Sequence, residues 1–436
     1  MSADARAPSA RPARRRRVLL GCALAVVGAA LATWGCAPLV LGEIAGASRH
    51  APDELERGLS PNARVVLERA RSGLDPARVL DVHTHVAGLG AGGSGCAVNP
   101  EMLSWAHPWK HAQFLVYAHA ARITDVERGD EQFVERLTAL ARASGWNGAT
   151  PRYGLLAFDQ HYRADGTVDL AHTEMHVPND WVFDVCAREP ALFVPVCSVH
   201  PYRADALAEL ERCAKRGAKL CKWLPNAMGI DPMDPRCDAF YAKAAELHVA
   251  LLAHTGDEHA VDAEGAQDLG NPLRMRRALE HGATVVLAHC GTLGDGVDLD
   301  AAARGKTDAP RVANFELFLR MMGEEKWKGR LFGEISAVTL RNRDTSVVAT
   351  LLERTDLHER LVNGSDYPLP AIRVVWSAQR FVAAGMLTED EARALEELYD
   401  YDPLVFDFAL KRTLHHPKTG ARFAASIFEG RAELGY

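Results

Sequence analysis

Residues 78–86 read Arg-Val-Leu-Asp-Val-His-Thr-His-Val (RVLDVHTHV), a short apolar run that ends in two histidines. Seven further apolar runs with polar ends follow it, separated by stretches rich in helix-forming residues. They are RYGLLAFDQHY (152–162), LFVPVCSVHP (192–201), AKLCKWLP (218–225), VALLAHTG (249–256), TVVLAHCG (284–291), RLFGEISAV (330–338) and RLVNGSDYP (360–368). Buried strands that alternate with helices are typical of a parallel sheet covered on both faces. Eight such units in roughly 290 residues predict an α/β fold, a TIM (β/α)₈ barrel.

A doubly wound open sheet is the alternative α/β arrangement, but no G-x-G-x-x-G motif follows any of the eight runs. We therefore expect the barrel to span residues 78–370, with a long, aromatic-rich insertion at 87–151. Long insertions after a barrel strand tend to cover the catalytic face. Residues 43–77 are expected to form a helical lead-in, and residues 371–436 a C-terminal helical extension.

The N-terminus has the pattern of a membrane address. Residues 1–17 carry six arginines and one aspartate, and residues 18–42 contain no Asp, Glu, Lys or Arg. An apolar stretch of this length can cross a bilayer, and positive charge before it keeps that end cytoplasmic. The pattern predicts a basic cytoplasmic tail, a transmembrane anchor and a catalytic body on the extracytoplasmic side. A signal segment that is cleaved on export is the alternative, since Arg15-Arg16-Arg17 resembles a twin-arginine signal and Ala30-Leu31-Ala32 a cleavage site.

The charge of the remaining chain excludes one class of function. Beyond the tail there are 44 basic and 56 acidic residues, a net charge of −12. An acidic body lacks the positive field that binding to a nucleic-acid backbone needs. We therefore expect a small-molecule substrate and no nucleic-acid partner.

The ends of the eight runs hold the residues that could carry chemistry. In chain order these are His83, His85, Asp159, His161, His200, Lys222, His254, His289, Glu334 and Asp366. Barrel active sites are built at the carboxyl ends of the strands, where side chains from different strands converge. His83 and His85 are two positions apart, so on one strand they face the same side and can hold one ion. Imidazoles with a carboxylate suit a divalent metal, most simply zinc.

The motifs DVHTHV, KWLP, LLAHTG, VLAHCG and NGSDYP, in this order, resemble those of the amidohydrolase superfamily, in its amidohydrolase-related ("amidohydrolase 2") branch. The resemblance covers about residues 78–410 and implies a metal-dependent barrel enzyme. Carried over by position, it implies that His83, His85, His254 and Asp366 are metal ligands. It also implies that His289 is a ligand or a base that orients the substrate.

Lys222 decides between one metal ion and two. Its position matches that of a carboxylated lysine that bridges two metals in some members of the superfamily. Its context, KWLPNAMGIDP, instead matches the branch in which this modification is not the rule. We expect one ion, with Lys222 and His289 as candidates for a second metal or for substrate binding.

The remaining polar strand ends have weaker signals. Asp159, His161, His200 and Glu334 are candidates for contacts to substrate or to the metal ligands, or are simply hydrogen-bonded strand ends. An aromatic cluster on the insertion is a candidate for lining the pocket or for local core: Trp105, His107, Trp109 and His111.

Three functions remain open on the sequence. The first is a metal-dependent hydrolase, in which an activated water attacks an amide, a lactone or another ester. Asp366 would act as the base, and His289 would polarise the substrate oxygen. The second is a metal-dependent decarboxylase of an aromatic or related acid, which needs a carboxylate-binding arginine near the metal. Arg152 and Arg203 do not lie at the carboxyl ends of strands, so hydrolysis is favoured. The third is a catalytically inactive barrel.

Overall fold

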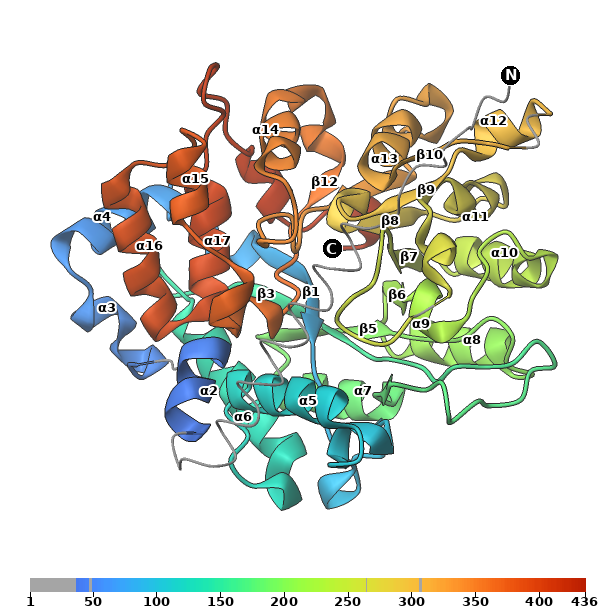
Figure 1. The fold of residues 1–436 in the computed structure, drawn as a ribbon, viewed down its shortest axis with the longest axis horizontal. Helices are drawn as coiled ribbons and strands as arrows, with labels where there is room; N and C mark the ends of the chain where they lie inside the picture. The colour runs from blue at the N-terminus through green and yellow to red at the C-terminus, as the bar shows by residue number, and fades with distance from the viewer. Residues whose placement is uncertain (1–36, 47–48, 264, 306–307) are drawn as a thin grey trace, which may run out of the picture.

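The computed structural model describes residues 37–46, 49–263, 265–305 and 308–436 (Figure 1). Its centre is one eight-stranded parallel sheet in the order β1-β3-β5-β6-β7-β8-β11-β12. The strands are β1 (Leu80–His85), β3 (Arg152–Leu156), β5 (Phe193–Cys197), β6 (Leu220–Trp223), β7 (Ala250–His254), β8 (Val285–Ala288), β11 (Leu331–Glu334) and β12 (Leu361–Val362). Each lies within one of the eight apolar runs, so the predicted TIM barrel is confirmed.

The barrel closes between its first and last strands. The backbone N–H of Val82 donates to the carbonyl of Asn363 at 3.0 Å, and the N–H of His85 donates to the carbonyl of Tyr367 at 2.9 Å. Between them, the N–H of Asp366 donates to the carbonyl of His83 at 2.7 Å. These bonds continue the parallel pairing past the end of β12, so Asp366 is placed beside the two histidines of β1.

The barrel interior is a small apolar layer to which every strand contributes. Its buried residues are Leu80, Val82, Leu156, Val196, Leu220, Ala250, Leu252, Val286, Ala288, Phe332, Val362 and, from the C-terminus, Leu434. Because side chains alternate along a strand, the next inward positions after Leu220, Leu252 and Phe332 are Lys222, His254 and Glu334. The alternation that points apolar side chains into the barrel therefore also points these three polar side chains inward, at the carboxyl ends of their strands.

The outward faces of the strands pack against a ring of helices. These are α7 (Asn179–Arg188), α8 (Ala206–Lys215), α10 (Asp238–Glu246), α11 (Arg276–Glu280), α13 (Asn314–Met322) and α14 (Thr345–Glu353). In α13 the buried residues Leu317, Phe318, Met321 and Met322 recur at helical spacing, which gives the apolar stripe that faces the sheet. Two two-stranded ribbons lie outside the barrel sheet: β9 (Asp295–Val297) with β10 (Arg311–Ala313), and β2 (Ala97–Val98) with β4 (Met175–His176).

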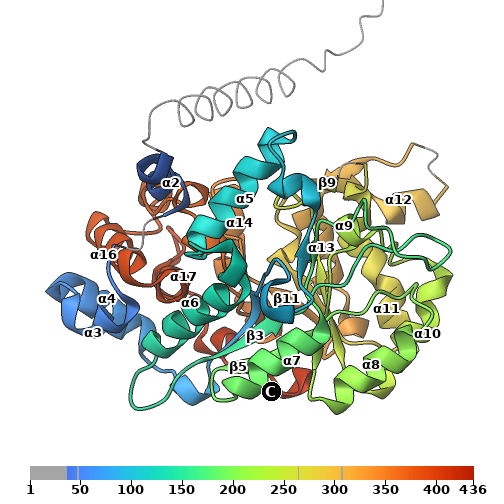
Figure 2. The same cartoon turned by 90° about the horizontal axis from the view of Figure 1, so that it is seen from below.

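The long segment after β1 forms helices that lie against the barrel (Figure 2). It contains α5 (Pro108–Ala120) and α6 (Gly129–Ala143). Helix α6 buries Phe133, Leu137 and Leu140 at helical spacing. The side chains of Gln113 and Tyr117 on α5 donate to the carbonyl of Ala260, at 2.5 and 3.0 Å. Those bonds connect the segment to the loop that follows β7.

The first and last described parts of the chain pack together beside the barrel. Helix α4 (Pro61–Arg71) contacts both α16 (Glu389–Tyr401) and α17 (Pro403–Thr413). Thr388 and Glu391 form a capping box at the start of α16, and the carboxylate of Asp402 accepts from the first backbone N–H groups of α17. These helices are amphipathic or buried, and they extend the core of the barrel on one side.

The predicted membrane location is overturned. Residues 1–36, which include the basic tail and most of the predicted span, lie outside the described residues, and the rest of the span begins α2 (Ala37–Ala45), a helix of 9 residues. Among the helices of the described ranges, none is long and apolar enough to cross a membrane. We therefore do not retain the anchored or exported placement of the body.

Leu434, near the C-terminus, gives a test of how the barrel interior is filled. It is 2% exposed and packs against the interior layer, so Leu434→Ala should leave a cavity and lower the free energy of unfolding by about 2–5 kcal/mol. Leu170, which is 65% exposed, is the matched control, and Leu170→Ala should change stability by no more than about 0.5 kcal/mol. Denaturant unfolding of the two variants measures the difference. Equal stability of the two would mean that the C-terminus does not fill the barrel.

Candidate metal centre

A cavity of about 450 Å³ opens at the carboxyl ends of the barrel strands. Six predicted site residues line it: His83, His85, Lys222, His254, His289 and Asp366. They come from five different strands or strand ends, and all except the half-buried His85 are buried. The fold thus places on one cavity every residue that the sequence assigned to the metal or to catalysis, although His254 belongs to neither of the two groups of described residues whose ligand atoms lie close enough to share an ion.

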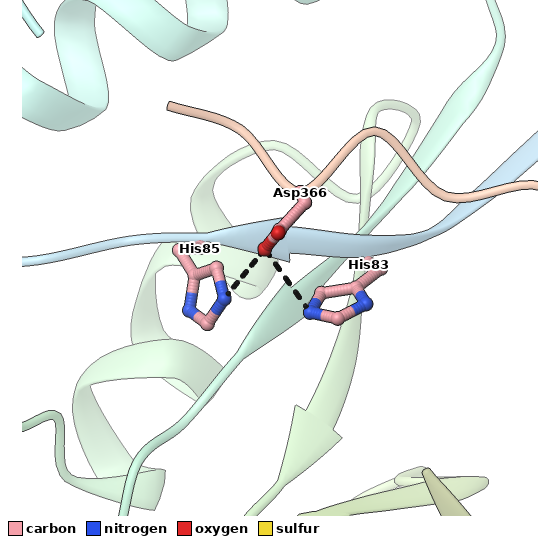
Figure 3. Close-up of side chains that lie close together, drawn as sticks. All are labelled: His83, His85 and Asp366. Atoms are coloured by element: carbon pink, nitrogen blue, oxygen red, sulfur yellow. Dashed lines mark ion pairs between the residues drawn. The ribbon is translucent and has the colours of Figure 1, made fainter. Parts of the chain in front are cut away.

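Asp366 lies between the two histidines of β1 (Figure 3). Its Oδ1 is 3.1 Å from Nε2 of His85 and 3.4 Å from Nε2 of His83. The three atoms therefore lie close together, although the histidines are on β1, the first strand of the sheet order, and Asp366 follows β12, the last. Asp366 has a φ of 61°, a left-handed conformation that is uncommon outside glycine and that concentrates at functional sites.

Glu334 and Ser336 fix the orientation of two imidazoles. Nδ1 of His83 is 3.0 Å from Oε2 of Glu334, and the hydroxyl of Ser336 donates to the same oxygen at 2.7 Å. Since the proton of the Ser336 hydroxyl is used in this bond, the hydroxyl accepts from Nδ1 of His289, at 2.8 Å. Both histidines are thereby assigned a proton on Nδ1, and each keeps an unprotonated Nε2. This is the tautomer that a metal ligand or a base requires.

His254 extends the cluster by one ring. Its centroid is 4.8 Å from that of His289, and its Nδ1 is 3.5 Å from Oε2 of Glu258. Its Nε2 is buried and has no hydrogen-bond partner among the described residues. A buried nitrogen without a partner is costly, so it calls for a ligand.

Lys222 reaches the centre of the cluster. Its Nζ is 2.9 Å from Nε2 of His83, and the residue is 1% exposed. Burial lowers the pKa of Lys222 to about 8, although the negative charges of Asp366 and Glu334 act in the opposite direction. Only the neutral amine can be carboxylated, and the lowered pKa makes this form more abundant than in an exposed lysine.

Burial dominates the electrostatics of the site. It lowers the pKa values of His83, His254 and His289 well below the usual value, and the charge of Lys222 adds to the effect at each of them. Burial also raises the pKa of Glu334 to about 7. The imidazoles of His83, His254 and His289 are therefore neutral at physiological pH, as metal binding demands.

The donor set fits a divalent ion. His83, His85 and Asp366 offer ligand atoms close enough to share one ion, and so do His83, His289 and Glu334. Glu334 already accepts from Nδ1 of His83 and from the Ser336 hydroxyl. An ion held by the first group would leave these supporting hydrogen bonds intact. Nε2 of His254, which has no partner among the described residues, is a further nitrogen donor on the same cavity.

Three of the weaker candidates belong to a separate polar cluster that does not line the cavity. The N–H of His200 donates to Asp159, which also pairs with Arg203 at 3.0 Å. The ring of His161 contacts that of His172. Asp159 and His200 are hydrogen-bonded within this cluster, whereas Nδ1 of His161 is buried without a hydrogen-bond partner among the described residues, and none of the three lines the cavity.

The aromatic cluster of the insertion also lies outside the cavity. Trp105 and Trp109 are 75% and 56% exposed, and Nδ1 of His111 bonds to the carbonyl of Met102 at 2.9 Å. Other residues of the same insertion line the cavity instead, among them Met102, Phe114, Tyr117 and Phe133. The insertion contributes to the cavity as expected. It does so through the face of α5 that carries Phe114 and Tyr117, and not through the face that carries Trp109.

Arg343 is a residue of the cavity that the sequence did not indicate. It follows β11 by nine positions, lies in a loop and is 7% exposed. Its Nε donates to the Thr292 hydroxyl at 3.0 Å, and another guanidinium nitrogen donates to Asn342 at 2.8 Å. Nothing in the sequence indicated Arg343, because it lies beyond the end of β11. In a loop, the alternation of a strand no longer predicts where a side chain points.

Comparison with known proteins assigns the family. The family model described as Amidohydrolase (Amidohydro_2) matches residues 81–395, so the chain belongs to this family and is an enzyme of the amidohydrolase superfamily. No curated protein sequence matches it.

Solved structures resemble the chain only distantly. An uncharacterized TIM-barrel protein from Bordetella bronchiseptica is 15% identical, with 74% of this chain and 95% of that one covered and a TM-score of 0.44. A putative 2-pyrone-4,6-dicarboxylic acid hydrolase from Pseudomonas putida is 16% identical over 75% and 98%, with a TM-score of 0.40. A 5-carboxyvanillate decarboxylase from Sphingomonas paucimobilis is 14% identical over 74% and 96%, also with a TM-score of 0.40. Likeness at this level carries no argument about the reaction.

Glu334 tests the outer hydrogen bonds of the site. Glu334→Gln removes the charge that holds the proton on Nδ1 of His83, so affinity for a divalent ion should fall by about 10- to 100-fold. Titration of metal-free protein with Zn²⁺ against a competing chelator measures this change. Glu353→Gln, at an exposed position of α14, is the control and should bind like the wild type. Unchanged affinity in Glu334→Gln would show that the carboxylate does not tune the ligand.

Proposed function

We propose that this enzyme is a metal-dependent hydrolase that cleaves an amide, a lactone or another ester. The observation that supports it most is the convergence of Asp366 with Nε2 of His83 and of His85 at the floor of a largely apolar cavity. His83, His85, His254 and Asp366 would hold the ion. A bound divalent ion supplies Lewis-acid activation, which lowers the pKa of water from 15.7 toward about 7.

The protein side chains would do the remaining work. Oδ1 of Asp366 would take the proton of the attacking water and return it to the leaving group, since it faces the cavity and is within hydrogen-bond reach of the two imidazoles. His289, held through Nδ1 by Ser336, would keep its Nε2 directed at the substrate oxygen. Lys222 would hold the imidazole of His83 in place or, if carboxylated, serve as a ligand of a second ion.

A decarboxylase is the second candidate, and Arg343 favours it. A buried guanidinium that lines the cavity could hold the carboxylate of an acid beside the metal site. Neither Arg152 nor Arg203, the arginines that the sequence offered for this role, lines the cavity. A parallel screen of lactone, amide, phosphoester and aromatic-acid substrates separates the two reactions, because only decarboxylation releases carbon dioxide.

Metal content tests the ligand assignment. The purified protein should hold about one divalent ion per chain, or two if Lys222 is carboxylated. His83→Ala should lose most of this metal with little unfolding, whereas His161→Ala, at a strand end outside the cavity, should keep it. Elemental analysis after gel filtration gives the stoichiometry. Full metal in His83→Ala would refute the assignment, and a fall from two ions to one in Lys222→Ala would refute the single-ion site.

Asp366 tests the mechanism. Asp366→Asn keeps the shape and one acceptor oxygen but removes the charge and the basicity, so kcat should fall by about 10²- to 10⁴-fold with KM much less changed. Bound metal should weaken only in part, because the three histidines remain. Steady-state kinetics on any substrate from the screen, with metal measured on both proteins, decide the outcome. Asp165→Asn, in an exposed loop, is the control. Near wild-type kcat with full metal would move the base to His289.

A further inference from the structure

The cavity has two chemically different parts, and each points to one part of a substrate. One part holds the metal ligands and Arg343, and the other is a wall of apolar side chains. We propose that the substrate is a carboxylic acid with a bulky apolar body, whose carboxylate pairs with Arg343 and whose body lies against Phe114 and Tyr117. This inference rests on the proposed function, and it names the substrate class of that same site.

Arg343 is a buried cationic group of the cavity that has no ion pair within the described ranges. Its two hydrogen bonds go to the neutral side chains of Thr292 and Asn342, and it forms no ion pair with any carboxylate of the described ranges. Most other buried arginines of a protein are paired, because an unpaired buried charge is costly. Burial lowers the pKa of Arg343 to about 10, so the group is still charged at neutral pH. A planar carboxylate matches the fork of guanidinium donors.

The position of Arg343 places the carboxylate near the reacting centre. Thr292, which holds its Nε, follows His289 by three residues. Arg343 lines the same cavity as His254 and His289. The anionic end of the substrate would therefore lie on the His254–His289 side of the cavity.

The apolar wall comes from the insertion after β1. Phe114 and Tyr117 lie on successive turns of α5, and Phe133 of α6 and Phe158 after β3 continue the same wall. The hydroxyl of Tyr117 is already used, since it donates to the carbonyl of Ala260 at 3.0 Å, so the ring presents an apolar surface. This bond also holds α5 to the loop after β7. A cavity of about 450 Å³ falls in the range that encloses drug-sized ligands. This volume is larger than a substrate with a single aromatic ring would fill.

Equilibrium binding to zinc-loaded and to metal-free protein tests the proposal. The probes are biphenyl-4-carboxylate, biphenyl-4-carboxamide and benzoate, followed by isothermal titration calorimetry. Wild type should bind the biphenyl acid on the order of ten-fold more tightly than the amide, with or without metal, and more tightly than benzoate. Persistence in metal-free protein separates Arg343 from direct ligation of the ion.

Variants at two pairs of positions test separately whether Arg343 binds the carboxylate and whether the apolar wall binds the body of the substrate. Arg343→Met and Arg343→Gln should abolish the preference for the acid over the amide, whereas Arg341→Met, at the exposed rim two residues away, should keep it. Phe114→Ala should weaken binding of the biphenyl acid more than of benzoate. Trp109→Ala, on the exposed face of the same helix, should change neither. Thermal unfolding of each variant confirms that it is folded, and Arg343→Lys, which keeps the charge, should retain part of the preference.

Equal binding of the acid and the amide by wild type would overturn the proposal, as would an equal loss in the Arg343 and Arg341 variants. Equal loss of turnover on charged and uncharged esters in Arg343→Met would assign Arg343 to the transition state instead. The proposed hydrolase fails separately, if the protein holds no metal or turns over nothing in the screen. The binding preference is measured without turnover, so the two failures are distinguishable.

Discussion

Closure of the barrel between β12 and β1 is the constraint on which the metal site depends. The residues brought together there are more than 280 positions apart in the chain, and only the pairing of the first and last strands makes Asp366 a neighbour of His83 and His85. A buried carboxylate strengthens this junction: Oδ1 of Asp81 accepts from the N–H of His83 at 2.9 Å and from the N–H of Ser365 at 3.0 Å. One side chain thus orients the backbone on both sides of the ligand set.

The C-terminal helices support the same junction from the outside. Nζ of Lys411 on α17 donates to the carbonyl of Gly364 at 2.6 Å and pairs with Asp407 at 2.6 Å, and Lys411 is fully buried. Gly364 precedes Asp366, a candidate ligand, by two residues. A Cβ on Gly364 would meet the carboxylate of Glu334 and the Cβ of His83, so the loop approaches the site as closely as a glycine permits. The extension after the barrel is therefore connected to the loop that carries Asp366 by a buried hydrogen bond, and the ion pair within α17 holds the donating lysine.

Much of the fold and of the metal site could be predicted from the sequence, for a physical reason. Strands buried on both faces leave continuous apolar runs, and the alternation of side chains makes several of the polar residues at the ends of these runs point into the barrel mouth. Lys222, His254 and Glu334 illustrate this, since each follows an interior residue by two positions. On β1 the pairing register shifts between Asp81 and Thr84, yet the two histidines still reach the site together.

The rest of the cavity could not be predicted because nothing local determines it. The aromatic residues of the insertion occur on more than one face of α5, and only tertiary packing decides that Phe114 faces the cavity while Trp109 faces solvent. Arg343 lies in a loop, where the direction of a side chain depends on contacts such as that with Thr292. The placement of the candidate metal ligands follows from strand geometry, which is common to barrels, whereas the groups that would choose the substrate lie on the insertion and the loops. Substrate choice can therefore change in this fold while the ligand geometry stays fixed, because the two are built on different parts of the chain.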